Sequence, residues 1–179
     1  MKKKILIIGG TGFIGYHLAH RCQKLNWDVT SVSTKKPVGK RRLKKVKYSI
    51  CDISIRKKLK KIAKYKYDYL VNLGGYVDHI NKRKTYRAHY LGAKNLFQVF
   101  KNKKLKAFIQ IGSSMEYGGA KSPHTENIIG KPKGAYAKSK FMASKFLINC
   151  YEKYNFPVTV IRFYQLFGPN QDTNRFIPI

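Results

Sequence analysis

The sequence predicts an α/β fold in which a doubly wound parallel sheet carries helices on both faces. Short apolar runs rich in β-branched residues alternate with longer stretches in which apolar residues recur at helical spacing. Glycines follow the first run directly, and such strand–turn–helix units join parallel strands through right-handed crossovers. The 179 residues suffice for one core, so residues 1–179 are expected to form a single domain.

The same alternation gives the expected elements. Strands are predicted at 5–8, 28–33, 46–50, 69–73, 107–111 and 158–163. Helices are predicted from Phe13 onwards, at 54–63 with Ser54 as its cap, at 85–101 and at 135–154. Residues 35–47 carry eight Lys and Arg side chains and a Pro-Val-Gly, which indicates a surface loop.

The glycines behind the first strand predict a dinucleotide site. Gly9, Gly12 and Gly15 recur every third residue in Gly-Gly-Thr-Gly-Phe-Ile-Gly. A diphosphate reaches the free N–H groups at a helix N-terminus only where no Cβ keeps it away. Gly9 would turn the chain, Gly12 would admit the phosphates, and Gly15 would let the helix pack close to the sheet. This pattern is typical of a Rossmann-type fold, with Phe13 and Ile14 also near the cofactor; a tight turn without ligand is the alternative.

The end of the second strand bears on the choice of dinucleotide. An acid that accepts from the ribose 2′-OH is expected about 20 residues past the glycines. Ser33 occupies that place here, and Thr34 and Lys35 follow it. Hydroxyl and ammonium groups in place of a carboxylate favour a 2′-phosphate, so NADP is preferred and NAD is the alternative. Lys is common throughout the chain, so Lys35 could equally be a solvated surface residue.

Two more strand ends supply candidate cofactor residues, because ligands bind at the carboxyl edge of such sheets. Asp52 and Ile53 follow the third strand. Asp52 could accept from an adenine amino group or, with equal weight, mark the start of the next helix. Leu73, Gly74 and Gly75 follow the fourth strand and would let the backbone approach the cofactor, whereas a plain turn would use the same glycines.

A Tyr-x-x-x-Lys pair is the predicted catalytic centre. Tyr136 and Lys140 share one helical face, and the ammonium can lower the phenol pKa from its usual value of about 10. The same spacing occurs twice more, at Tyr90/Lys94 and Tyr117/Lys121. Only Tyr136 starts a helix that follows a strand ending in Ser113. Ser113 could polarise a carbonyl while Tyr136 moves a proton and a nicotinamide moves a hydride.

Together these motifs resemble the extended short-chain dehydrogenase/reductases, the NAD(P)-dependent sugar-nucleotide epimerase/dehydratase family. The resemblance covers nearly the whole chain, including Cys-Asp-Ile at 51–53, Ser-Ser-Met-Glu-Tyr-Gly at 113–118 and Arg-Phe-Tyr-Gln-Leu-Phe-Gly-Pro-Asn at 162–170. It implies hydride transfer at C4 of a nucleotide-linked hexose. By resemblance Ser113 is the catalytic hydroxyl, Tyr136 the acid/base and Lys140 the ribose-binding and pKa-tuning group. A catalytically silent dinucleotide-binding protein or a nucleic-acid-binding protein on the same fold is the alternative.

Departures from the family narrow the expected reaction. The 4,6-dehydratases follow their catalytic Thr with Asp-Glu, where this chain has Ser114 and Met115. Elimination of water therefore lacks its acid and base, and epimerisation or 4-keto reduction is expected. The closing segment is similar to CDP-abequose synthase-like 4-ketosugar reductases, which use NADPH and suit Ser33. Asn174, together with Ser114 and Met115, is expected to hold the sugar nucleotide, and His89 stands where the family usually has Asn.

The resemblance also implies a longer protein, because the family continues well beyond 179 residues to build a sugar-binding lobe. The C-terminal substrate lobe is therefore expected to be absent or only begun, with residues 170–179 as its start. Cofactor binding would survive in such a chain, whereas turnover would not. A homodimer through the helices at 85–101 and 135–154 is a family expectation.

The net charge of +30 has two interpretations. Of the 38 basic residues 30 are Lys, and they are spread over nearly every segment. Groove-directed recognition of nucleic acid usually depends on Arg and on bases clustered on one face, so a solvated Lys-rich surface is favoured over a dedicated nucleic-acid surface. Non-specific binding of polyanions at low salt is still expected.

Cysteine usage and hydropathy bear on the compartment. Cys22, Cys51 and Cys150 are odd in number, far apart and without His neighbours, which predicts reduced thiols and neither disulfides nor a metal site. The first apolar run is only about four residues long, too short for a secretion signal or a membrane span. The protein is therefore expected to be soluble, cytoplasmic and not bound to a membrane.

Overall fold

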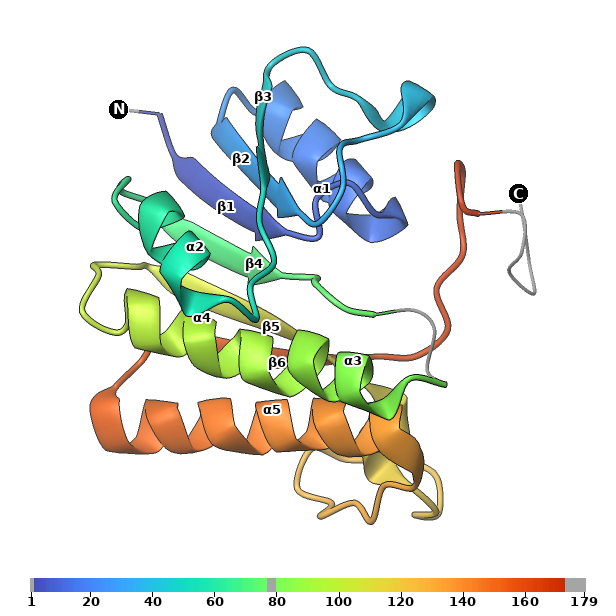
Figure 1. Cartoon of the computed structure of the whole chain (residues 1–179). Coiled ribbons are helices and arrows are strands. Elements are labelled where there is room, and N and C mark those ends of the chain that lie inside the picture. The colour runs from blue at the N-terminus through green and yellow to red at the C-terminus, as the bar shows by residue number, and fades with distance from the viewer. Residues whose placement is uncertain (1, 77–79, 173–179) are drawn as a thin grey trace.

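One parallel sheet organises the molecule. The computed structural model of the chain describes residues 2–76 and 80–172, so Asn174 lies outside the described residues. The strands are β1 (Lys4–Ile8), β2 (Asp28–Ser33), β3 (Val46–Ile50), β4 (Tyr69–Asn72), β5 (Ala107–Ser113) and β6 (Val158–Phe163). Their spatial order is β3-β2-β1-β4-β5-β6, so the direction of winding reverses between β1 and β4 (Figure 1). The predicted Rossmann-type sheet is confirmed.

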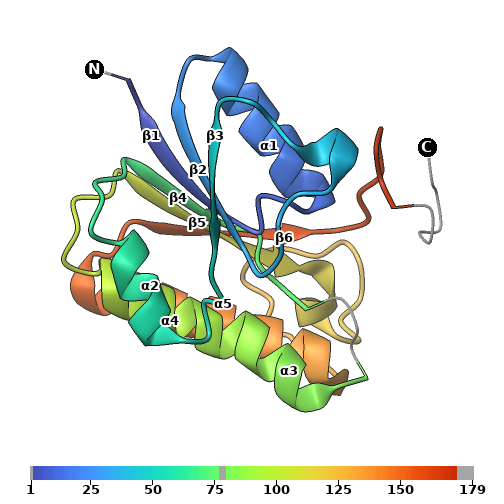
Figure 2. The same cartoon turned by 45° about the horizontal axis from the view of Figure 1, so that its top comes forward.

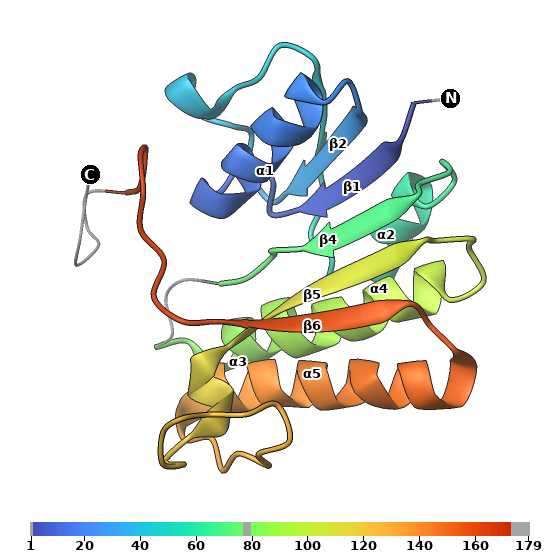
Figure 3. The same ribbon diagram turned by 180° about the vertical axis from the view of Figure 1, so that it is seen from behind.

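Helices cover both faces of this sheet, as predicted. One face carries α1 (Phe13–Lys24), which lies over β1 and β2 (Figure 3). The opposite face carries α2 (Arg56–Ile62), α3 (Lys82–Tyr86), α4 (Gly92–Phe100) and α5 (Gly134–Tyr154) (Figure 2). Three short turns complete the fold: η1 (Gly39–Arg41), the π-helical η2 (Arg87–Leu91) and η3 (Ser114–Tyr117).

Two buried clusters lie on the two sides of the sheet, and β1 contributes to both. Ile5 and Ile7 pack beneath α1, whereas Leu6 and Ile8 pack against α2, α4 and α5. Successive side chains of a strand point to opposite faces. A strand that is covered on both faces therefore has to be apolar at every position, which explains the uninterrupted run in β1.

The structure corrects the predicted starts of two helices. The helix predicted at 85–101 begins at Lys82, because the Asn81 side chain accepts from the Lys84 N–H at 2.9 Å and caps it. Its middle turn, η2, is π-helical. Ser54 does not cap α2; Ile55 holds the cap position, and no described side chain caps it. The loop at 35–47 contains one 3₁₀ turn, η1.

The three cysteines are free and buried, which agrees with the prediction of reduced thiols. Burial raises the pKa of Cys22, Cys51 and Cys150, so their thiols are poor nucleophiles. Within the described ranges no cluster of His, Cys, Asp and Glu could hold a metal ion. No described helix is long and apolar enough to cross a bilayer.

Candidate functional site

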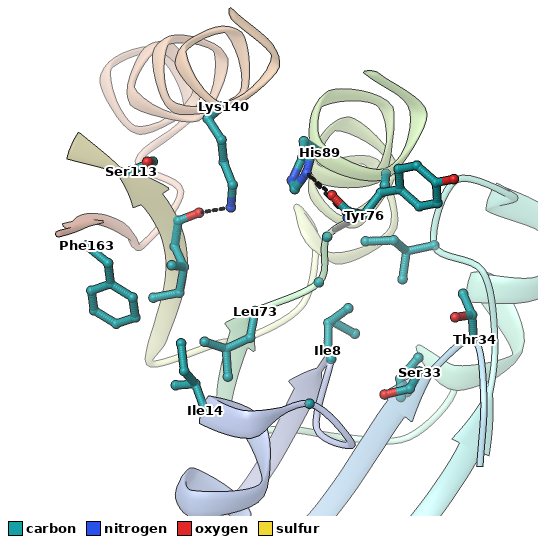
Figure 4. A pocket seen from close by; sticks show the side chains of 18 of the residues that line it. Ile8, Ile14, Ser33, Thr34, Leu73, Tyr76, His89, Ser113, Lys140 and Phe163 are labelled. Carbon is teal, nitrogen blue, oxygen red and sulfur yellow. Dashed lines mark hydrogen bonds between the residues drawn. The ribbon is translucent and has the colours of Figure 1, made fainter. Parts of the chain in front are cut away.

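A cavity of about 530 Å³ lies at the carboxyl ends of the strands, above the point where the winding reverses (Figure 4). Most predicted cofactor and catalytic residues line it: Gly9, Gly12, Ile14, Ser33, Thr34, Asp52, Ile53, Leu73, Gly74, Gly75, Ser113, Tyr136 and Lys140. Five predicted residues are not part of the lining: Phe13, Gly15, Lys35, Ser114 and Met115. Segments from most of the chain thus meet at one edge of the sheet, because parallel strands all end there.

The glycine turn between β1 and α1 forms one wall of the cavity. Its glycines exclude a side chain for different structural reasons. Gly9 has a φ of +78°, and a Cβ there would lie 2.8 Å from the Leu73 carbonyl oxygen. A Cβ at Gly15 would collide with the Gly9 carbonyl, so Gly15 lets α1 pack against the turn. Internal packing therefore requires both of these glycines.

Gly12 differs from Gly9 and Gly15, because contacts within the protein restrict a side chain least at this position. Among the described residues a Cβ there would meet only the Gly9 carbonyl oxygen, at 3.3 Å, and the Gly12 φ of −76° suits any residue. Gly12 is the N-cap of α1, no described side chain caps that end, and the first turn contains no acid. The N–H groups of this turn are therefore left for an anion in the cavity, which favours a ligand over a plain turn.

The end of β2 is tied to the glycine turn. Ser33 accepts a hydrogen bond from the Thr11 N–H at 3.3 Å through its hydroxyl oxygen. Thr34 lines the cavity, and Lys35 is exposed just beyond it. Arg41 is the first arginine of the following loop. Its guanidinium donates to the Asp172 carboxylate at 2.8 Å and to the Asn170 carbonyl at 2.7 Å.

The next two strand ends are fixed by side-chain hydrogen bonds. Asp52 lines the cavity, and its Oδ1 accepts from the Ser54 N–H at 2.8 Å, so it orders the turn without capping α2. Asn72 accepts from the Gly74 N–H at 3.1 Å and donates to buried Gln110 at 2.8 Å. The glycine loop behind β4 is thereby anchored to β5.

Tyr136 and Lys140 reach the cavity from α5, opposite the glycine turn. Lys140 is only 5% exposed, and its Nζ donates to the Ile111 carbonyl at 2.8 Å (Figure 4). Its Nζ lies 6.0 Å from the centre of the Tyr136 ring. Burial lowers the pKa of Lys140 to about 8, although the negative charge of Glu116 acts in the opposite direction.

The structure distinguishes the three Tyr-x-x-x-Lys pairs. Among the described residues, only Tyr136 and Lys140 have both members in the cavity wall. Tyr90 instead packs against Phe146 of α5, and the Lys94 Nζ lies 5.5 Å from the centre of the Tyr90 ring. Tyr117 is buried and bonded to Arg162.

Ser113 is held at the end of β5 by a reciprocal cap. Glu116 accepts from the Ser113 N–H at 2.9 Å, and the Ser113 Oγ accepts from the Met115 N–H at 3.2 Å. Glu116 is 1% exposed and is paired with Arg162 of β6 at 3.1 Å. A Cβ at Gly112 would lie 2.5 Å from Glu116. Sequence reasoning missed Glu116, although Ser-x-x-Glu is the recognisable signal of such a cap.

His89 is a buried part of the wall that the sequence singled out without assigning it to the site. Its ring meets Tyr136 edge to face, with centroids 5.1 Å apart. Its Nε2 lies 3.3 Å from the Tyr76 nitrogen and 3.4 Å from the Tyr76 carbonyl oxygen (Figure 4). A Cβ at Gly75 would lie 2.6 Å from the His89 ring, so the position of this histidine leaves no room for a side chain at residue 75.

Sequence reasoning also missed the wall formed by the segment behind β6. Phe163, Tyr164 and Leu166 line the cavity. This segment then crosses to α1, where the Pro169 carbonyl lies 2.8 Å from the His17 Nε2. The available signal was their position at the carboxyl end of a strand, the same rule that located Ser33 and Leu73.

Comparison with known protein families gives a match over nearly the whole chain. The model of the NAD dependent epimerase/dehydratase family matches residues 5–179. The chain belongs to this family. The resemblance seen in the sequence motifs is therefore confirmed.

Two curated relatives illustrate the similarity. The chain is 28% identical to dTDP-D-glucose 4,6-dehydratase of Dictyostelium discoideum, over 98% of this chain and 46% of that protein. It is 30% identical to Protein CapI of Staphylococcus aureus, over 93% of this chain and 55% of that protein. The chain thus spans about half the length of the curated relatives it matches.

Solved structures of the family share the fold. UDP-glucose 4-epimerase of Thermotoga maritima, solved with UDP-glucose, superimposes with a TM-score of 0.87 at 21% identity, over 94% of this chain and 57% of that one. The dTDP-glucose 4,6-dehydratase of Bacillus anthracis, solved in complex with NAD, superimposes with a TM-score of 0.86 at 21% identity, over 98% of this chain and 59% of that one.

Removing the buried charge of Lys140 is expected to change how stability depends on pH. The pKa of Lys140 in the folded protein is about 8, below the ordinary lysine value of 10.5. Protonation of Lys140 therefore destabilises the folded state relative to the unfolded state. This cost is fully present below pH 8 and disappears as the pH rises toward the unfolded pKa. The stability of Lys140→Met relative to the wild type should therefore be greater at pH 7 than at pH 10 by about 2 kcal/mol. Denaturant unfolding at pH 7 and pH 10 measures this, and an advantage that is equal at both values would contradict it.

Proposed function

We propose that this chain is the cofactor-binding part of a nucleotide-sugar epimerase or 4-keto reductase that transfers hydride at C4 of a nucleotide-linked hexose. The observation that carries this proposal is one cavity with the glycine turn at one side and Ser113, Tyr136 and Lys140 at the other. The N–H groups in the first turn of α1, which no described side chain caps, fit the diphosphate of NAD(P). When bound, NAD(P) supplies the hydride acceptor and donor.

The side chains suit this chemistry. Lys140, buried beside Tyr136, brings a positive charge that favours the phenolate, and its ammonium would hold the ribose hydroxyls of the bound cofactor. Tyr136 would take the proton from the C4 hydroxyl and return it. The Ser113 Oγ accepts from Met115, which leaves its own hydrogen to donate to the C4 oxygen. The edge-to-face contact with His89 supports the Tyr136 ring in this orientation.

Epimerisation or reduction is better supported than dehydration. By resemblance, Ser114 and Met115 stand where the 4,6-dehydratases have the Asp and Glu that act as acid and base in elimination. The nearest acid in this segment, Glu116, is buried and paired with Arg162. It therefore cannot approach a sugar in the cavity without breaking a buried ion pair.

The test of the proposed function separates cofactor binding from turnover, since the chain spans about half the length of its curated relatives. Fluorescence titration with NADPH and NADH measures binding by the residues described. Incubation with cofactor and UDP- or dTDP-hexoses, followed by NMR of the C4 configuration, measures the reaction. Failure to bind either dinucleotide would refute the proposal. Dimerisation through α4 and α5 stays a prediction.

For the cofactor we propose a preference for NADP over NAD. Ser33 and Thr34 put hydroxyl groups at the wall, and exposed Lys35 lies next to them. Among the described residues that line the cavity, no acid lies at this end of β2. A 2′-phosphate would therefore meet hydrogen-bond donors and a positive charge.

Ser33→Asp is expected to reverse this preference. A carboxylate at the end of β2 repels a 2′-phosphate and accepts from a 2′-OH instead. The affinity for NADPH should fall about ten-fold or more, while that for NADH should stay equal or rise, because a like charge at contact costs at least about 1.4 kcal/mol. Parallel fluorescence titrations measure both constants. Ser33→Ala is the control, because it removes the hydroxyl without adding charge. An unchanged NADPH to NADH ratio in Ser33→Asp would contradict the proposed preference.

A further inference from the structure

A second cavity, of about 550 Å³, lies at the opposite edge of the sheet, where the strands begin. Its walls come from the starts of β1, β2 and β3 and from the segment between α2 and β4. This segment lies at the same end of the sheet as the N-terminus (Figure 1). The amino-edge cavity is therefore separate from the dinucleotide site, and a ligand bound in it would be independent of the proposed function.

Positive charge dominates the amino-edge cavity. Four lysines line it, from three different segments: Lys4, Lys45, Lys47 and Lys66. Within residues 2–76 and 80–172, none of their ammonium groups lies within 4.0 Å of a carboxylate. Asp28 is the one acid among the described lining residues. The adjacent Asp68 is already bound by the Lys4 N–H at 2.8 Å and by Lys106 at 3.5 Å. The cavity is thus suited to an anion.

Tyrosines alternate with these lysines. Residues 64–67 read Lys-Tyr-Lys-Tyr, and Lys47 is followed by Tyr48. Tyr48 has a structural role, because its hydroxyl oxygen accepts a hydrogen bond from the Leu43 N–H at 2.9 Å. Tyr67 packs against the core and is bonded to Thr30. Tyr65, in contrast, is 70% exposed beside the cavity. Its ring is therefore available as a stacking surface.

Basic side chains continue outside the cavity. Lys3, Lys44 and Lys64 are exposed and adjoin its lining in sequence. A single small anion would need only the cavity, whereas charge that extends past its rim suits a chain of phosphates. A basic groove combined with an exposed aromatic ring is the arrangement by which proteins hold unpaired bases and their backbone.

We propose that the amino-edge cavity binds single-stranded nucleic acid, with Lys4, Lys45, Lys47 and Lys66 on the phosphates and the Tyr65 ring against a base. The structure divides the basic run at 35–47 between two edges: Lys35 lies by the dinucleotide cavity, whereas Lys45 and Lys47 line this one. Positions 45, 47 and 66 come together only in the folded sheet, where β3 pairs with β2, β2 with β1, and β1 with β4, the strand that follows Lys66.

The stacking part of the proposal is tested with a labelled oligo-dT and fluorescence anisotropy at ~200 mM salt, where purely non-specific phosphate contacts weaken steeply. The wild type is expected to bind, and Tyr65→Ala to bind about five-fold or more weakly. Tyr151→Ala is the matched control, because Tyr151 is 56% exposed on α5, outside the lining. Loss of all wild-type binding at this salt, or equal effects of the two substitutions, would overturn the proposal.

The phosphate part is tested through the dependence of affinity on salt. Replacing Lys47 and Lys66 together by Gln should reduce the slope of log affinity against log salt by about 1.4, the value for two phosphate contacts on a single strand. The matched double substitution of Lys138 and Lys145, which are exposed on α5, should leave the slope unchanged. An equal reduction of the salt slope in both double variants would show non-specific charge attraction instead. So would a duplex that competes for binding as well as the single strand does. All four lysines are exposed, so thermal melting should match the wild type.

Discussion

Replacing Tyr136 by Phe should abolish nucleotide-sugar turnover while leaving NAD(P)H bound. The substitution removes only the hydroxyl that would exchange a proton with the C4 oxygen, and general acid–base catalysis of this kind contributes about 10²–10⁴-fold. The ring itself stays, together with its edge-to-face contact with His89 and its place beside Lys140. Because this chain alone is expected to bind cofactor without turnover, kcat for epimerisation or keto reduction is measured on a form that includes a substrate lobe. The cofactor affinity is determined in parallel, which separates the two effects.

The chain supplies a matched control for this experiment. Tyr90 has the same spacing to a lysine, but neither it nor Lys94 belongs to the described cavity lining. Tyr90→Phe should therefore leave turnover and cofactor affinity unchanged. If Tyr136→Phe kept wild-type kcat, or if Tyr90→Phe lost it, the assignment of the acid/base to α5 would be wrong.

Gly12→Val should reduce the affinity for the dinucleotide by about 100-fold or more without unfolding the protein. A branched side chain at the N-cap of α1 would project beside the N–H groups that receive the diphosphate. Loss of two charge-assisted hydrogen bonds is of this order. Only one contact of 3.3 Å, to the Gly9 carbonyl oxygen, limits a Cβ there, so the fold should accommodate the change. Fluorescence titration with NADPH measures the affinity, and thermal melting measures the stability.

Gly119→Val is the control for a glycine replaced outside the cavity. No described atom lies within 4 Å of a Cβ at Gly119, and the residue does not belong to the lining. It should bind NADPH as the wild type does. Wild-type affinity in Gly12→Val would mean that the diphosphate does not lie at this turn, and an equal loss in both variants would indicate general destabilisation.

The strands were accessible to sequence reasoning because their signals are local. The apolar run of β1 predicts burial on both faces, and its last four residues do contribute to the two cores. Helix starts were less accessible. The helix that begins at Lys82 opens with Lys-Arg-Lys, which has no apolar periodicity, and its start depends on the Asn81 cap. A cap is one polar residue among many, so it is easily overlooked.

The sequence by itself determined the fold class and the glycine turn, because apolar spacing, β-branched runs and the conformational freedom of glycine act between close neighbours. Only the tertiary structure decided that Lys140 is buried at the cavity wall and donates to the Ile111 carbonyl. It also paired Glu116 with Arg162, 46 positions away. These features depend on how distant strands and helices pack, and spacing along one segment carries no information about that packing.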